Sequence, residues 1–165
     1  MNKKNLIIII SWLLVIIWMG IIFWFSDMNT NESNTKSKNT ITNVIESTVD
    51  TTNKLGITDK HPSEEKKQEV TNKLNEPLRK GMHASVYLVL AILLMNALIV
   101  SNCKLWLAII LSIIISFIYA CSDEYHQTFV GRTGQFSDVL IDTVGALIGN
   151  GIYCIGYYIY KRVKK

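Results

Sequence analysis

The sequence predicts an all-α membrane protein with four transmembrane helices and a partly helical outer loop between the first and the second. The chain has 165 residues, 49% hydrophobic and 18% charged, and its apolar residues lie in four long blocks. A hydrocarbon core of about 30 Å needs roughly 20 apolar helical residues, which is close to the length of each block. The net charge of +4 comes from basic residues that flank these blocks, since the long polar stretch between the first two is neutral overall. The basic excess therefore indicates topology and not a nucleic-acid surface.

Residues 1–26 are predicted to hold an N-terminal cytoplasmic flank and the first transmembrane helix, from about Leu6 to Phe25. The apolar core is longer than that of a signal peptide, and the residues after it are too large for a cleavage site. We therefore expect this helix to be retained as a membrane anchor.

Residues 27–80 are predicted to form a polar extracellular loop. The composition of 29–39 is typical of disorder. The apolar residues of 41–49 have helical spacing, which indicates a short amphipathic helix. A second helix is expected to start after Pro62 and to break at Pro77, unless Pro77 opens a new helix.

Residues 81–165 are predicted to form a three-helix membrane core with a cytoplasmic basic tail. Its spans cover about 82–100, 105–121 and 139–160, and the turn of Ser101–Lys104 is short enough to make the first two an antiparallel hairpin. Short flanks rich in Lys and Arg stay in the cytoplasm. Lys3 and Lys4, Lys104 and the tail would all be inside if both termini are cytoplasmic, so this topology is predicted.

Two polar segments interrupt this pattern at the predicted outer face, namely 79–87 and 122–142. Ionisable groups near or inside a span are costly, so they are candidates for function. The candidate ligand-binding residues are Arg132, Gln127, Asp138, Asp142, Tyr87 and Arg79. The candidate catalytic residues, if the protein is an enzyme, are Glu124, His83 and Asp123.

Helical spacing groups these residues on shared faces. Arg79, His83 and Tyr87 are four residues apart, and Asp123 and Gln127 share a face if the third helix continues past Ser122. In the fourth helix, Asp138 and Asp142 lead into Gly145 and Gly149, a GxxxG pattern that lets another helix approach closely. The sequence thus predicts one polar site, with helix packing at the two glycines.

Structural interpretations of the same residues stay open. Asp142 would hold the bundle together if it paired with Arg132 or Arg79, and His83 would serve equally well as a buried hydrogen-bonding residue. His126 is expected to be exposed in a turn. No cofactor motif occurs, and no metal site is expected because no tight ligand spacing appears, although carboxylates and a histidine can bind a divalent ion. The three cysteines are expected to be unpaired.

The polar segments resemble those of the VanZ-like family, small bacterial membrane proteins linked to low-level resistance to the glycopeptide antibiotic teicoplanin. The resemblance covers Phe25-Ser26, the segment from Lys80 to Tyr87 and the run from Tyr119 to Gly149. This run contains Tyr119-Ala120, Asp123-Glu124, His126-Gln127, Phe129, Gly131-Arg132, Asp138, Asp142, Gly145 and Gly149. Val130 stands where the family often has a proline before the Gly-Arg pair.

The resemblance implies action at the outer face of the bacterial cell envelope. The first hypothesis is a resistance factor that binds the drug, which carries a fatty acyl chain, or a lipid-linked wall precursor. The second is an intramembrane enzyme, in which His83 or Glu124 acts as a general base and Arg132 holds a phosphate or carboxylate. A transporter is disfavoured because four short spans show no inverted repeat. The bilayer is the expected partner in every case, and oligomeric state stays open.

Overall fold

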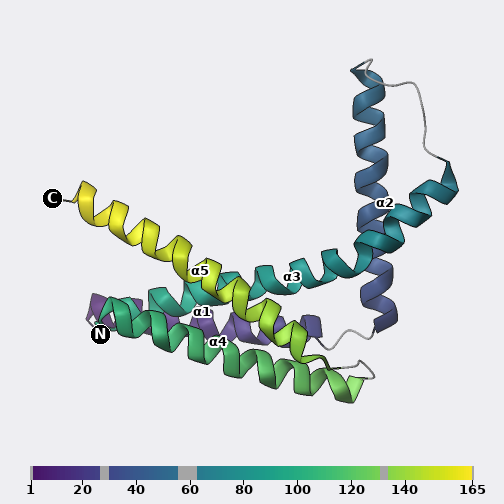
Figure 1. Cartoon of the computed structure of the whole chain (residues 1–165). Helices are drawn as coiled ribbons and strands as arrows, with labels where there is room; N and C mark the ends of the chain where they lie inside the picture. The colour runs from purple at the N-terminus through teal and green to yellow at the C-terminus, as the bar shows by residue number, and fades with distance from the viewer. Residues whose placement is uncertain (1, 27–29, 56–62, 131–133, 165) are drawn as a thin grey trace. The chain divides into compact units, whose positions relative to one another are not determined.

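The computed structural model describes residues 2–26, 30–55, 63–130 and 134–164. The described chain is helical: α1 (Lys3–Ser26), α2 (Thr30–Lys54), α3 (Glu64–Val100), α4 (Leu105–Gln127), the short 3-10 helix η1 (Thr128–Val130) and α5 (Phe136–Val163) (Figure 1). The chain divides into two compact units, a discontinuous one of residues 1–28 and 82–165 and one of residues 29–81. The prediction of an all-α membrane protein is confirmed, because four of these helices are long and apolar enough to cross a membrane.

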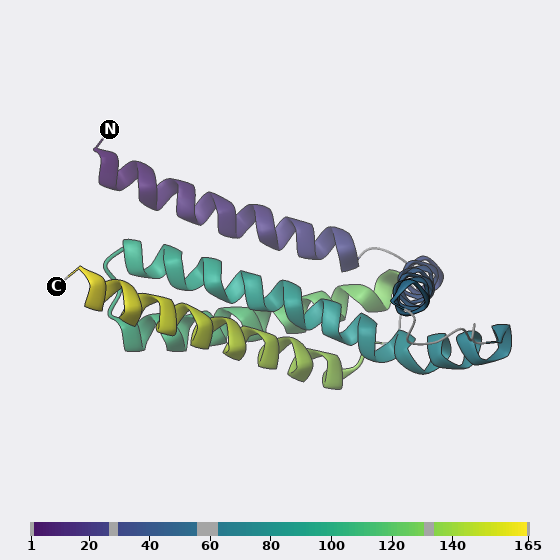
Figure 2. The same cartoon turned by 90° about the horizontal axis from the view of Figure 1, so that it is seen from above.

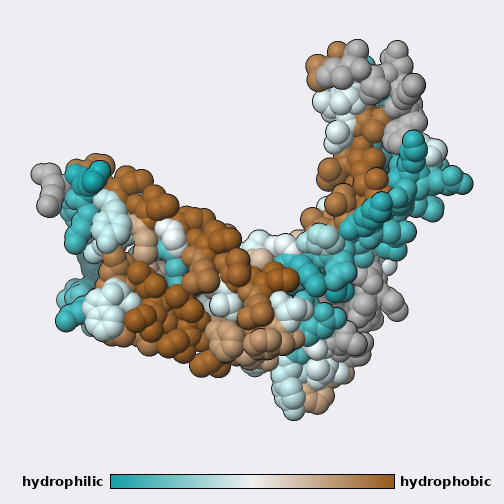
Figure 3. Space-filling model, viewed as in Figure 1, coloured by the Kyte–Doolittle hydropathy of each residue, from teal (hydrophilic) through white to brown (hydrophobic). Residues whose placement is uncertain are grey.

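The first unit, here the membrane unit, contains α1, the second half of α3, α4 and α5. Their sides expose large apolar residues such as Ile16, Ile118 and Ile155. In Figure 3 hydrophobic surface covers these sides, and hydrophilic residues gather at the end where α1 begins and α5 ends. We call this end the basic end, because Lys4 of α1 and Lys161 and Arg162 of α5 lie there. Lys4 donates to the Asn102 side chain at 3.1 Å. A multi-pass membrane protein has this distribution, because lipid contacts the sides and water the ends.

The turn between α3 and α4 is closed by backbone hydrogen bonds. The amide of Asn102 donates to Ile99 O and that of Cys103 to Leu98 O, each at 3.0 Å. Asn102 has φ 67°, the left-handed conformation that follows many helices and that asparagine tolerates. The predicted hairpin therefore rests on a Schellman-type helix end.

Helix α5 packs against α3 backbone to backbone. A Cβ added at Gly145 would overlap the carbonyl oxygen of Ala84, and one at Gly149 would overlap that of Leu88. Both contacts advance by four residues in the same direction, so α3 and α5 run parallel. The glycines permit this approach because they have no side chain.

Helix α1 is attached by side-chain hydrogen bonds. The Trp18 indole donates to Val86 O at 2.9 Å, and the Tyr119 hydroxyl donates to Met19 O at 2.6 Å. Nearer the basic end, Trp12 donates to the Ser101 hydroxyl at 3.2 Å. Figure 2 shows α1 running alongside the other three helices, with both chain ends at the same end of this unit. These hydrogen bonds join α1 to α3 and α4 without the close backbone contact described for α3 and α5.

The second unit contains α2 and the first half of α3. Two expectations about it are wrong. Residues 30–39 are helical, because α2 extends ahead of the amphipathic stretch, and Pro77 lies inside α3 without ending it. Proline removes the hydrogen bond to the carbonyl four residues earlier, and that residue, Lys73, has an exposed side chain, so water can reach its backbone.

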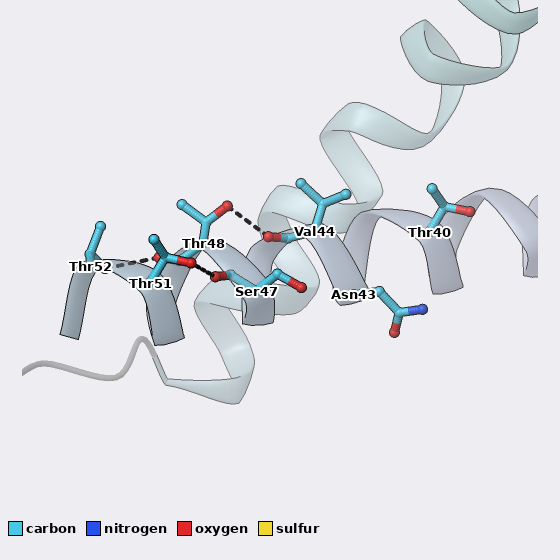
Figure 4. A pocket seen from close by; sticks show the side chains of 7 residues that line it. All are labelled: Thr40, Asn43, Val44, Ser47, Thr48, Thr51 and Thr52. Carbon is cyan, nitrogen blue, oxygen red and sulfur yellow. Dashed lines mark hydrogen bonds between the residues drawn. The ribbon is translucent and has the colours of Figure 1, made fainter. Parts of the chain in front are cut away.

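One face of α2 is lined by small polar side chains around a shallow groove of about 500 Å³ (Figure 4). Thr48 donates to Val44 O and Thr51 to Ser47 O, each at 2.7 Å. These bonds occupy the hydroxyl hydrogens of Thr48 and Thr51 within the helix, so these two residues present mainly methyl groups and oxygen lone pairs to the groove. It carries no charged lining residue.

Candidate functional site

Three helices bring polar groups together at the end of the membrane unit opposite the basic end. Tyr87 of α3, Asp123 of α4 and Asp142 of α5 are all almost completely buried, at 0%, 0% and 1% exposure. Asp142 and Tyr87 each lie close enough to Asp123 and Glu124 to interact with them electrostatically. The structure thus gathers these residues in one place, which we call the acidic site.

Asp142 stands out within the acidic site. Neither of its carboxylate oxygens has a hydrogen-bond partner among the described residues, and the same holds for the Tyr87 hydroxyl. Buried polar groups are normally hydrogen-bonded, since leaving one unsatisfied costs about 1–3 kcal/mol. An acceptor and a hydroxyl are therefore available for a ligand or for ordered water.

The end of α4 is built by side chains that hold the following turn. The helix continues past Ser122 to Gln127, so Asp123 and Gln127 share a face, and the Gln127 amide donates to the Asp123 carboxylate at 3.3 Å. Glu124 accepts from the backbone amide of Gln135 at 3.0 Å. Glu124 thereby ties α4 to the residue just before α5, which positions Asp142 opposite α4.

A second polar layer lies deeper in the membrane unit. Ser112 of α4 donates to the Asn150 side chain at 2.9 Å, and both residues are buried. Ser116, one turn closer to the acidic site, is completely buried, and its hydroxyl has no partner among the described residues. This layer was not predicted from the sequence. Its signal is the four-residue spacing of Ser112, Ser116 and Ala120, which leads to Asp123 on one face.

His126 is not exposed in a turn as expected. It lies near the end of α4, half buried, with its ring stacked on Phe23 of α1 at a centroid distance of 4.1 Å. The expectation failed because α4 extends two turns beyond the apolar block that marked its predicted end. The stack links α1 to α4.

The remaining predicted residues are distributed as follows. His83 and Asp138 are half buried, and each precedes a residue of the acidic site by four positions, Tyr87 and Asp142 respectively. Arg79 belongs to the second unit, and Arg132 lies outside the described residues. The structure accordingly leaves the predicted Asp142–Arg132 pair untested.

The chemistry available at the acidic site is that of clustered carboxyl groups. No group of three or more His, Cys, Asp or Glu side chains within the described ranges could hold a metal ion. The site offers carboxylate acceptors, one phenolic hydroxyl and an amide, which suits a ligand that donates hydrogen bonds or carries positive charge.

Comparison with protein families shows to which family the chain belongs. The family model described as VanZ/LLP1 matches residues 11–157. The chain belongs to the VanZ/LLP1 family. The match covers most of the membrane unit, runs through the second unit and includes every residue of the acidic site. Neither the curated proteins nor the solved structures contain a significant match to this member of the VanZ/LLP1 family.

Proposed function

We propose that this VanZ/LLP1 protein acts at the outer face of the bacterial cell envelope and confers low-level resistance to teicoplanin-type lipoglycopeptides. It would do so by binding the drug or a lipid-linked wall precursor. The observation that carries the proposal is the buried Asp142 carboxylate, which has no hydrogen-bond partner among the described residues. A carboxylate kept unpaired inside a membrane protein is costly, so a ligand group is a physical reason for its presence.

The proposed orientation places both termini in the cytoplasm. Lys4 and Asn102 meet at the basic end, and Lys161 and Arg162 lie in the last turn of α5 at this same end. Short basic flanks favour the cytoplasmic side, which would put the acidic site outside. A cysteine introduced at Thr128 should react with a membrane-impermeant reagent in intact cells, and one at Val163 should react only after permeabilisation, in a background without the native cysteines.

The resistance test compares two drugs in a susceptible Gram-positive host. Expression of the chain should raise tolerance to teicoplanin more than to vancomycin, since teicoplanin carries the acyl chain. Asp142→Asn and Tyr87→Phe should reduce the teicoplanin effect, and Glu69→Gln, an exposed residue of the second unit, should not. An equal or absent shift for both drugs would remove support for the resistance function.

The intramembrane enzyme is a second candidate, favoured by one observation. Three carboxyl groups, those of Asp123, Glu124 and Asp142, are buried within reach of each other. Such clusters hold protons at unequal affinities, which suits acid–base chemistry. The Glu124→Gln variant distinguishes the two candidates, provided that it is inserted in the membrane. It should abolish catalysis, whereas a binding function should decline in steps across the site variants.

A further inference from the structure

A groove of about 540 Å³ lies between α1 and α4, and its residue Tyr119 has its ring 6.3 Å from that of Tyr87 in the acidic site. It is lined by Gly20, Phe23, Trp24, Tyr119 and His126. Its volume is within the range of about 300–1,000 Å³ typical of ligand pockets. Four of the five lining residues carry aromatic rings, and the fifth is Gly20, which has no side chain.

The groove is formed by definite contacts. Tyr119 spans α4 to α1 through its 2.6 Å hydrogen bond to Met19 O, and Phe23 stacks on His126 at 4.1 Å. These two links lie on either side of Gly20 along α1. A Cβ added at Gly20 would meet nothing within 4 Å, so the missing side chain leaves the space between the links open.

The surroundings decide what can fill this space. Ile16, Ile17 and Ile118, on the two helices that form the groove, are 57–63% exposed and belong to the apolar sides of the spans. Within the bilayer these sides contact hydrocarbon and not water. Rigid aromatic walls offer dispersion contacts to a chain and lose little conformational freedom when it binds.

We propose that this groove is a binding seat for one acyl chain of a bilayer phospholipid, which it holds more tightly than the lipid around the other helices. The walls are mainly aromatic, so the contacts are made with the hydrocarbon chain and not with the head group. The inference does not depend on the proposed resistance function, because it rests on the lining of the groove and its ligand is an ordinary bilayer phospholipid.

The test is a titration of the full-length protein in mild detergent with dioleoyl phosphatidylglycerol, with bound lipids counted by native mass spectrometry. The wild type should bind a first lipid more tightly than later ones. Gly20→Phe should weaken that first step by roughly tenfold, about 1.4 kcal/mol, because the phenyl ring occupies the groove. Trp24→Ala, which removes one wall, should weaken it as well.

The matched control is Gly156→Phe, since Gly156 is also exposed on a span and a Cβ there would meet nothing within 4 Å. This variant should keep the tight first step, and dioleoyl phosphatidylcholine should bind the wild type like phosphatidylglycerol. The proposal is overturned if the wild type shows no distinct first step, if Gly20→Phe and Gly156→Phe behave alike, or if only the anionic lipid binds. A loss in Gly20→Phe without any drug tolerance in the wild type would support the groove and contradict the resistance function.

Discussion

Helices α5 and α1 both lie against the rest of the membrane unit, but they are held there in different ways. α5 meets α3 where Gly145 and Gly149 bring the two backbones into contact. α1 is joined by hydrogen bonds from Trp12, Trp18 and Tyr119 and by its buried side chains Val15 and Ile22. Between helices in lipid the hydrophobic effect supplies no net attraction, so close packing and interhelical hydrogen bonds must provide it. The attachment of α5 shows glycine-mediated close packing, and that of α1 shows hydrogen bonds in addition to packed side chains.

The difference also separates the two candidate binding surfaces. Close packing at the glycines brings Asp142 against the α3 and α4 side chains of the acidic site, which requires a fixed register. At Gly20 of α1, by contrast, an added Cβ would meet nothing within 4 Å, so the groove stays open there. A close contact therefore supports the polar site and an open space the apolar groove, and single substitutions can test each.

The largest effect is expected from Gly145→Ala. The new Cβ would overlap the Ala84 backbone, which has no flexible end to move aside, so we expect a loss of about 1–3 kcal/mol in stability. Thermal unfolding in detergent measures it. Gly151→Ala is the matched control on the same helix, with nothing within 4 Å of its Cβ, and should gain about 0.5–1 kcal/mol from helix preference. Equal shifts in the two variants would contradict backbone contact between α3 and α5.

A smaller change of opposite sign is expected from Asp142→Asn. The substitution replaces a buried carboxyl group that has no hydrogen-bond partner among the described residues by an amide, so stability should rise by roughly 1 kcal/mol while ligand binding falls. Ser112→Ala, which breaks the paired Ser112–Asn150 contact, should lower stability instead. If Asp142→Asn also destabilises the protein, Asp142 has a partner outside the described residues, for which Arg132 is the candidate.

The smallest effect is expected from Tyr119→Phe. It removes the hydrogen bond to Met19 O but keeps the ring, and such bonds between membrane helices are worth about 0.6 kcal/mol on average. Unfolding in detergent compares it with Tyr158→Phe, whose side chain is exposed and should have no effect. A loss as large as that of Gly145→Ala would mean that α1 is attached as tightly as α5.

The sequence was sufficient to predict the spans and the shared face of Asp142 and the two glycines, because both depend on local spacing, whereas the full polar site with Arg132 stays a prediction. A block of about 20 apolar residues must cross the bilayer, and Asp142, Gly145 and Gly149 share a face on any helix. The helical state of 30–39 and the continuity of α3 through Pro77 were not predicted, since composition and a proline describe only average preferences. The Ser112–Asn150 bond and the groove beside Gly20 depend on which faces of neighbouring helices meet, and no local pattern specifies that.

The parallel course of α3 and α5 has a consequence for biogenesis. Two parallel spans must be separated in the chain by a span that crosses back, which here is α4. Helix α5 is therefore the last of the four spans to leave the ribosome. Until it arrives, the α4 face that carries Asp123, Ser116 and Ser112 has no α5 to cover it, and a carboxylate turned toward lipid is expensive. We therefore expect the unfinished protein to remain bound to the insertion machinery. A chain that stops before Phe136 should be recognised and degraded by membrane proteases.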